Sequence, residues 1–330
     1  MNQVIRFFIL FILLISLGFS QLGVTTTNDT LNYKNYHLKV LEAETLIANE
    51  KYQSALDIYH NLFATYSFVF LREYKVASQL AVLLNHQAVA FDILEKGILG
   101  GWSKKSINKN QFLSEFLKEE KSKDIMSSYE KLNLTFKSRL NDSLRNQVHD
   151  MFKRDQKLAI KALFKLSSTS QDKYAERKFA PNSENQMQKL DLMLRETGYP
   201  GQKIIGNDIW MSTILSHHNS ISQAYAEKDS LYPNVRPRLL LAIDQGELSP
   251  FEFAMIDEWR LATLTNPTEV SYGFLKAPKK NQLRRSDSLR KAIGIRSVLL
   301  RNKLVDIEEK TGMDLYLFGS PWVKGKIELQ

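Results

Sequence analysis

The hydrophobic positions at the start of the folded region recur with the period of an α-helix. After Tyr52, apolar or aromatic residues follow at offsets of 3, 4, 7, 10, 11 and 14, the last of them Tyr66. This spacing places them on one face of a helix. Leu38–Ala48 predicts a preceding helix, and the polar residues 49–51 predict the turn between the two. We therefore expect a helix–turn–helix unit at this point.

The pattern of this unit returns, more weakly, further along the chain. The sequence ALDIY at 55–59 is echoed 35 residues later by AFDIL at 90–94, and a polar turn returns at 85–87. The residues that carry the repeat pattern are Ala43, Leu46, Tyr52, Ala55, Tyr59 and Leu62 in the first unit and Ala81, Ala90 and Leu94 in the second. Such a repeat resembles the tetratricopeptide repeat. The resemblance implies a tetratricopeptide-like helical lobe over residues 24–100, whose surface would bind a protein or peptide partner.

The rest of the chain, residues 103–330, is predicted to form a second helical domain. Gly100 and Gly101 interrupt the helical pattern before it and mark the boundary. Helices are predicted over residues 137–166, 182–197, 209–227, 233–245 and 286–309, with a further helix that starts at Pro250. The tail, 315–329, fits either extended chain or two short strands about residues 319–321, a C-terminal β-hairpin. The predicted fold class is mainly α.

One carboxylate interrupts the apolar stripe of the helix predicted over 137–166. The stripe runs in steps of three and four from Leu140 to Leu166, and Asp155 occupies one of its positions. A carboxylate on a buried face must be paired or hydrogen-bonded, because burying it alone is costly. Asp155 is therefore either a functional group, such as a general base or a metal ligand, or one half of a structural ion pair. Gln156 stands beside it.

Polar side chains also interrupt the apolar faces of the next helices. His217 and His218 lie in the middle of the apolar face of the helix that is predicted to start near Trp210. Neighbouring helix residues point about 100° apart, so one histidine points inward while the other flanks it. They lack the i, i+4 spacing of paired metal ligands. A capping box with Pro250 starts another helix, which carries Arg260.

Six short motifs are spread across this part of the chain. They are MFKRDQKL (151–158), GYPG (198–201), ILSHHNS (214–220), GELSP (246–250), DEWR (257–260) and SYG (271–273). In order and spacing they resemble an uncharacterised family of bacterial proteins, a domain of unknown function, over about residues 145–275. The resemblance implies a mostly helical, often exported protein. It also implies that one pocket is formed by Asp155, Gln156, Pro200, His217 or His218, and Arg260.

These observations together name the candidate site. The candidate catalytic residues are Asp155, His217, His218 and Arg260. The candidate binding residues are Gln156, Pro200, Trp210 and Tyr272. No metal ligand is proposed.

The composition and the missing motifs exclude several kinds of functional site. The chain is 43% hydrophobic and 25% charged, which is the balance of a folded protein. It has no cysteine and six histidines, so a disulfide scaffold and a cysteine nucleophile are ruled out and a metal site has no support. It has no P-loop, dinucleotide-binding glycine motif or nucleophile elbow, and no cofactor is predicted. The net charge is +9, but the basic stretch 276–291 lacks aromatic residues, so no nucleic-acid partner is expected.

The first residues predict export. Residues 1–6 carry one positive charge, residues 7–19 are almost entirely apolar, and Gly18 and Ser20 are small residues suited to cleavage after Ser20. This is the pattern of a signal peptide over residues 1–20, and an uncleaved anchor is the alternative. Thirteen apolar residues are few for a bilayer span. We expect a periplasmic or secreted protein with no stable membrane anchor after the signal peptide is removed.

Two hypotheses about function follow. The first is an exported helical protein that binds a ligand or a partner. The second is an exported, hydrolase-like enzyme in which a histidine acts as general base, Asp155 orients it and Arg260 stabilises an anion.

Overall fold

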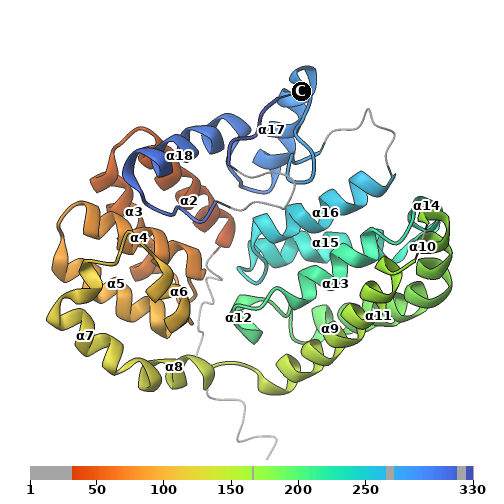
Figure 1. The fold of residues 1–330 in the computed structure, drawn as a ribbon, viewed down its shortest axis with the longest axis horizontal. Helices are drawn as coiled ribbons and strands as arrows, with labels where there is room; N and C mark the ends of the chain where they lie inside the picture. Colours follow the sequence, from red (N-terminus) through yellow and green to blue (C-terminus); the bar gives the residue numbers. More distant parts are fainter. Residues whose placement is uncertain (1–31, 166, 265–270, 318–324, 330) are drawn as a thin grey trace, which may run out of the picture. The chain divides into compact units, whose positions relative to one another are not determined.

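The computed structural model describes residues 32–165, 167–264, 271–317 and 325–329. These residues are mainly helical and contain no β-strand, so the predicted mainly α class is confirmed (Figure 1). The predicted signal peptide lies outside the described residues. None of the helices in the described ranges combines the length and the apolar character that a membrane span requires.

The helices follow one another along the chain in three groups. The first group comprises α2 (Tyr33–Ala48), α3 (Tyr52–Thr65), α4 (Leu71–Leu83), α5 (Gln87–Leu99), α6 (Lys104–Lys109), the 3₁₀-helix η1 (Phe116–Lys118), α7 (Glu120–Ser127) and α8 (Tyr129–Lys137). The second comprises α9 (Asp142–Leu163), α10 (Ser168–Tyr174), the π-helix η2 (Ala175–Phe179), α11 (Ala180–Glu196), α12 (Gln202–Ile205) and α13 (Trp210–Asn219). The last comprises α14 (Gln223–Lys228), α15 (Leu231–Asp244), α16 (Pro250–Leu264), the 3₁₀-helix η3 (Lys280–Gln282), α17 (Leu283–Ala292) and α18 (Val298–Thr311).

The first hydrophobic core is built from α2–α8 and is completed by the end of the chain. Helix α2 packs on α3 and α4 packs on α5, and Ala55 and Ala90 are fully buried. Leu304 and Ile307 of α18 enter the same core, where α18 packs on α2. In a tetratricopeptide array each unit packs on its neighbours in sequence. Here α2 packs on α18, which is far from it in the sequence, so the structure does not support the predicted tetratricopeptide-like pairing.

The second core holds the helices that carry the candidate site. It is formed by apolar residues of α9, α11, α13, α15 and α16, with contributions from the segment 272–295. Helix α13 packs on both α9 and α16, and also contacts α11. The candidate residues of α9, α13 and α16 are therefore within reach of one another.

The helix predicted over 137–166 is α9, which begins at Asp142 because Asn141 caps it by accepting a hydrogen bond from the Leu144 N–H. Two other predicted helices each prove to be two. The helix predicted over 209–227 ends at Asn219, and Ser222 caps α14. The helix predicted over 286–309 divides at Gly294, whose φ of 78° is one that a glycine adopts without strain.

The predicted C-terminal β-hairpin is not supported. The turn predicted at residues 319–321 lies outside the described residues. Leu315–Leu317 and the described residues 325–329 are not in strands. Leu315 instead packs into the first core, where its burial needs no strand partner.

Candidate functional site around two histidine–aspartate pairs

Helix α13 sends its two adjacent histidines in different directions. Because neighbouring residues of a helix point about 100° apart, His217 and His218 meet different helices. His218 is completely buried, whereas the side chain of His217 is 31% exposed. Each histidine contacts its own aspartate, so two histidine–aspartate pairs lie side by side on one helix.

The first pair joins α13 to α9. The Nδ1 atom of His217 donates to Oδ2 of Asp155 at 2.5 Å, and the Nε2 amide of Gln156 lies 3.5 Å from the same oxygen. Asp155 is fully buried, and its Oδ1 has no hydrogen-bond partner among the described residues. Burial raises the pKa of Asp155, and the hydrogen bond from His217 opposes that rise. The sequence prediction of an inward-facing carboxylate at this position is confirmed.

The ring of His217 has a defined orientation. With Nδ1 directed at Asp155, Nε2 lies on the other side of the ring. The edge of Phe179, the last residue of the π-helix η2, packs against this ring at 6.1 Å between centroids. A histidine held by a buried carboxylate, with part of its ring exposed, has the geometry of a proton acceptor.

The second pair belongs to a largely buried network. The Oδ2 atom of Asp229 lies 3.3 Å from Nε2 of His218 and accepts a hydrogen bond from Nη1 of Arg260 at 2.7 Å. The Oδ1 atom of Asp229 accepts from the backbone N–H of Leu231 at 2.8 Å. On its other side, His218 contacts the hydroxyl of Ser183 through Nδ1 at 2.9 Å. Burial alone would raise the pKa of Asp229, but His218, the Leu231 N–H and Arg260 together lower it.

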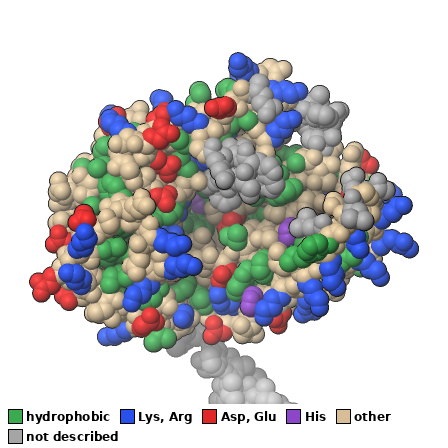
Figure 2. All heavy atoms as spheres, in the orientation of Figure 1, with side chains coloured by type: hydrophobic (Ala, Val, Ile, Leu, Met, Phe, Trp, Pro, Cys, Tyr) green, Lys and Arg blue, Asp and Glu red, His purple; other side chains and the backbone are tan. Residues whose placement is uncertain are grey.

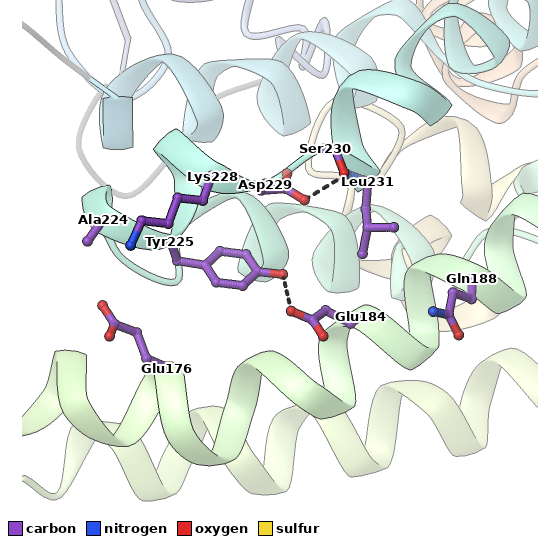
Figure 3. Close-up of a pocket in the computed structure, with 9 residues that line it drawn as sticks. All are labelled: Glu176, Glu184, Gln188, Ala224, Tyr225, Lys228, Asp229, Ser230 and Leu231. Atoms are coloured by element: carbon purple, nitrogen blue, oxygen red, sulfur yellow. Dashed lines mark hydrogen bonds between the residues drawn. The ribbon is translucent and has the colours of Figure 1, made fainter.

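A cleft of about 430 Å³ opens beside the second pair (Figure 3). The side chains of Glu176 on η2 and Glu184 on α11 point into the cleft, opposite Tyr225 and Lys228 of α14. The Tyr225 hydroxyl donates to Oε1 of Glu184 at 3.1 Å across the cleft. Burial and the nearby Glu184 carboxylate raise the pKa of Tyr225. Asp229 also lines the cleft, and its side chain, which is 1% exposed, makes the hydrogen bonds of the second pair.

The other candidate binding residues make contacts away from these two pairs. The Trp210 ring stacks on His149 at 4.5 Å, at the end of α13 opposite to the histidines. The Tyr272 hydroxyl donates to Oδ2 of Asp257 at 3.1 Å. Pro200 is buried in the turn before α12.

The structure thus divides the expected single pocket. It brings Asp155, Gln156 and His217 together, and it separately brings His218 and Arg260 together through Asp229. Among the described residues, no group of three or more His, Asp or Glu side chains is arranged to hold a metal ion.

Sequence reasoning missed Asp229 and the cleft residues. The position of Asp229, two residues before the first residue of α15, was a usable signal, because an aspartate there accepts the free N–H groups of a helix start. The Tyr225–Glu184 contact joins residues 41 positions apart and has no local sequence signal. Comparisons with the profiles of known protein families, with curated proteins and with solved structures found no match to this chain.

Proposed function

We propose that this chain is an exported, helical ligand-binding protein whose ligand occupies the cleft between α11 and α14. The observation that carries the proposal is the cleft itself. The cleft is lined by the carboxylates of Glu176 and Glu184, the phenol of Tyr225 and the ammonium group of Lys228. Hydrogen bonds from the Leu231 N–H and from Arg260 fix the position of Asp229 in its wall. Ligand sites combine such a concave surface with a few fixed polar groups.

The charge of the cleft selects among ligands. Glu176 and Glu184 face a single cation, Lys228, because the charge of Asp229 is already matched by Arg260. A half-buried carboxylate such as Glu184 favours a ligand that carries hydrogen-bond donors or a positive charge. Polar ligands with an amino group therefore fit this cleft better than anions do.

Thermal-shift screening of the protein against pooled periplasmic and cell-wall metabolites tests the proposal. A ligand of the cleft should raise the Tm of the wild type and should act less on Glu184→Gln and Tyr225→Phe. Glu309→Gln, an exposed change outside the cleft lining, serves as the matched control. The proposal is wrong if a ligand stabilises Glu184→Gln as much as it stabilises the wild type.

Two further parts of this proposal come from the sequence. Helices α2–α5, whose sequence resembles a tetratricopeptide repeat, are proposed to offer a second surface, for a protein or peptide partner. Export is proposed from the signal-peptide pattern over residues 1–20. The intact mass of the protein recovered from its host tests export, since a chain that still begins at Met1 contradicts it.

A second candidate function is a hydrolase-like enzyme, and the contact of 2.5 Å between His217 and Asp155 favours it. Nε2 of His217 would take a proton from water or from a substrate hydroxyl, while Asp155 orients the ring and stabilises its charged form. Arg260 is committed to Asp229 and does not complete this pair. Hydrolysis of a panel of ester and amide substrates that is lost in His217→Gln and kept in His218→Gln would support the enzyme.

A further inference from the structure

The outer face of the second half of α9, together with the two residues that follow the helix, combines basic and apolar side chains. Lys153, Arg154, Lys157, Lys161 and Lys165 are exposed there, together with two apolar side chains. Those two are Ile160, which is 48% exposed, and Phe164, which is 78% exposed. At 100° per residue, the five of these side chains that lie within α9 fall in a sector of about 120°, and Phe164 and Lys165 directly follow the end of the helix. They form a single surface, which we call the α9 basic face.

The position of Asp155 shows that this face is directed away from the core. Asp155 is the one acidic residue between Lys153 and Lys165, and it lies about 160° around the helix from Lys157. Because Asp155 is fully buried, Lys157 points to solvent. Residues 153–165 therefore place five cations and no carboxylate on this face, and Asp150, one turn earlier on the helix, is the nearest carboxylate in α9.

Few of these cations are neutralised by neighbouring elements. Lys153 lies 3.6 Å from Asp150, and Lys165 lies over the Tyr174 ring. Lys157 and Lys161 make no ion pair with any described residue. Lys and Arg side chains gather along the edge of the molecule that α9–α11 form (Figure 2). Within the described part of the chain, the charges of Lys157 and Lys161 on this surface are therefore not matched by an ion pair.

We propose that the α9 basic face docks reversibly on an anionic phospholipid membrane. Helices that lie in a membrane interface carry Lys and Arg beside exposed Phe, Leu or Ile, because the cations attract lipid phosphates and the apolar side chains enter the acyl boundary. A soluble polyanion would be attracted by the lysines but would gain little from Phe164 and Ile160. The mixture of charge and apolar surface therefore selects the bilayer.

Vesicle co-sedimentation tests the proposal with the protein as its host produces it. The vesicles are equal parts of phosphatidylglycerol and phosphatidylcholine, compared with phosphatidylcholine alone. The wild type should bind the anionic vesicles and should release them as salt is added. Lys157→Glu with Lys161→Glu should weaken binding by at least about 25-fold, since each cation near an anionic surface contributes roughly fivefold.

Matched variants separate this face from general charge and general hydrophobicity. Lys279→Glu with Lys280→Glu makes the same charge change at exposed positions of the other basic stretch and should leave binding unchanged. Phe164→Ala should weaken binding by about tenfold. Leu134→Ala, at a residue that is 63% exposed on α8, should have no effect.

Three results would overturn the proposal. In the first, the wild type fails to prefer anionic over neutral vesicles. In the second, the Lys279 and Lys280 pair of changes weakens binding as much as the Lys157 and Lys161 pair. In the third, Phe164→Ala binds like the wild type while the lysine changes abolish binding, which would assign the face to a soluble polyanion. All the substituted side chains are exposed, so circular dichroism should show the same helix content in every variant.

Discussion

The two histidine–aspartate pairs share one helix and differ in what holds the carboxylate. Asp229 follows α14 and precedes α15, where backbone N–H groups are free to donate to it. Asp155 lies inside α9, where the backbone N–H groups are already used by the helix, and its Oδ1 has no partner among the described residues. A carboxylate between helices can be saturated by the backbone, whereas one inside a helix depends on side chains from other elements.

This difference assigns separate roles to the pairs. Both carboxylate oxygens of Asp229 are hydrogen-bonded and buried, as those of a structural element are, although Nε2 of His218 itself makes no hydrogen bond with a described residue. The Asp155 pair is left with an unsatisfied oxygen and a partly exposed histidine, and such incompletely satisfied groups concentrate at functional sites.

The largest expected effect comes from breaking the buried network. Arg260→Leu leaves Asp229 with less compensation for its charge and should lower the free energy of unfolding by about 3–5 kcal/mol. Arg195→Leu removes an exposed partner of Asp191 and should cost less than about 1 kcal/mol. Urea unfolding measures both, and equal losses would contradict the structural role of Asp229.

Chemical labelling of the histidines should separate the pairs by exposure. Diethyl pyrocarbonate should modify His217 more than about tenfold faster than His218, because the buried ring is reached only when the structure opens. Peptide mapping by mass spectrometry follows the two sites. In urea the two rates should become equal, which serves as the control.

The two aspartates should respond to pH in opposite directions. The pKa of Asp155 is raised from 3.8, so the stability of the wild type relative to Asp155→Asn should fall as the pH rises from 3.8 through the raised pKa. The pKa of Asp229 is lowered, so the stability of the wild type relative to Asp229→Asn should fall as the pH drops below 3.8 through the lowered pKa. In each case the free energy of unfolding, relative to that of the Asn variant, should change by about 1.4 kcal/mol for each unit by which the pKa differs between the folded and unfolded protein.

Urea unfolding of the three proteins over a series of pH values measures these trends. Parallel curves for the two variants would show that the pairs are electrostatically equivalent.

The smallest expected effect concerns Gln156. Its amide lies 3.5 Å from Asp155, too far for a strong hydrogen bond, so Gln156→Ala should change the free energy of unfolding by less than about 0.5 kcal/mol. The same urea titration measures it. A loss above about 1 kcal/mol would mean that Gln156 supports the carboxylate directly.

Helical content and the inward position of Asp155 could be predicted because both depend on local periodicity. The stripe that contains Asp155 is a property of consecutive turns, and the partner on α13 follows once His217 and His218 are placed on an apolar face. The split between α13 and α14 was missed because the apolar pattern continues through the break, while the Ser222 cap that causes it is a single side chain. The cleft depends on Glu184 meeting Tyr225, and tertiary packing alone decides that contact.

The position of α18 affects the order in which the protein can fold. Leu304 and Ile307 lie in the same core as α2, and Glu44 of α2 forms a buried ion pair with Arg296 just before α18. That core is incomplete until α18 has been synthesised. Contacts between distant parts of a chain slow folding, so the first core should stay loosely packed until α18 has emerged. Such a delay is what a protein needs if it crosses a membrane before it folds.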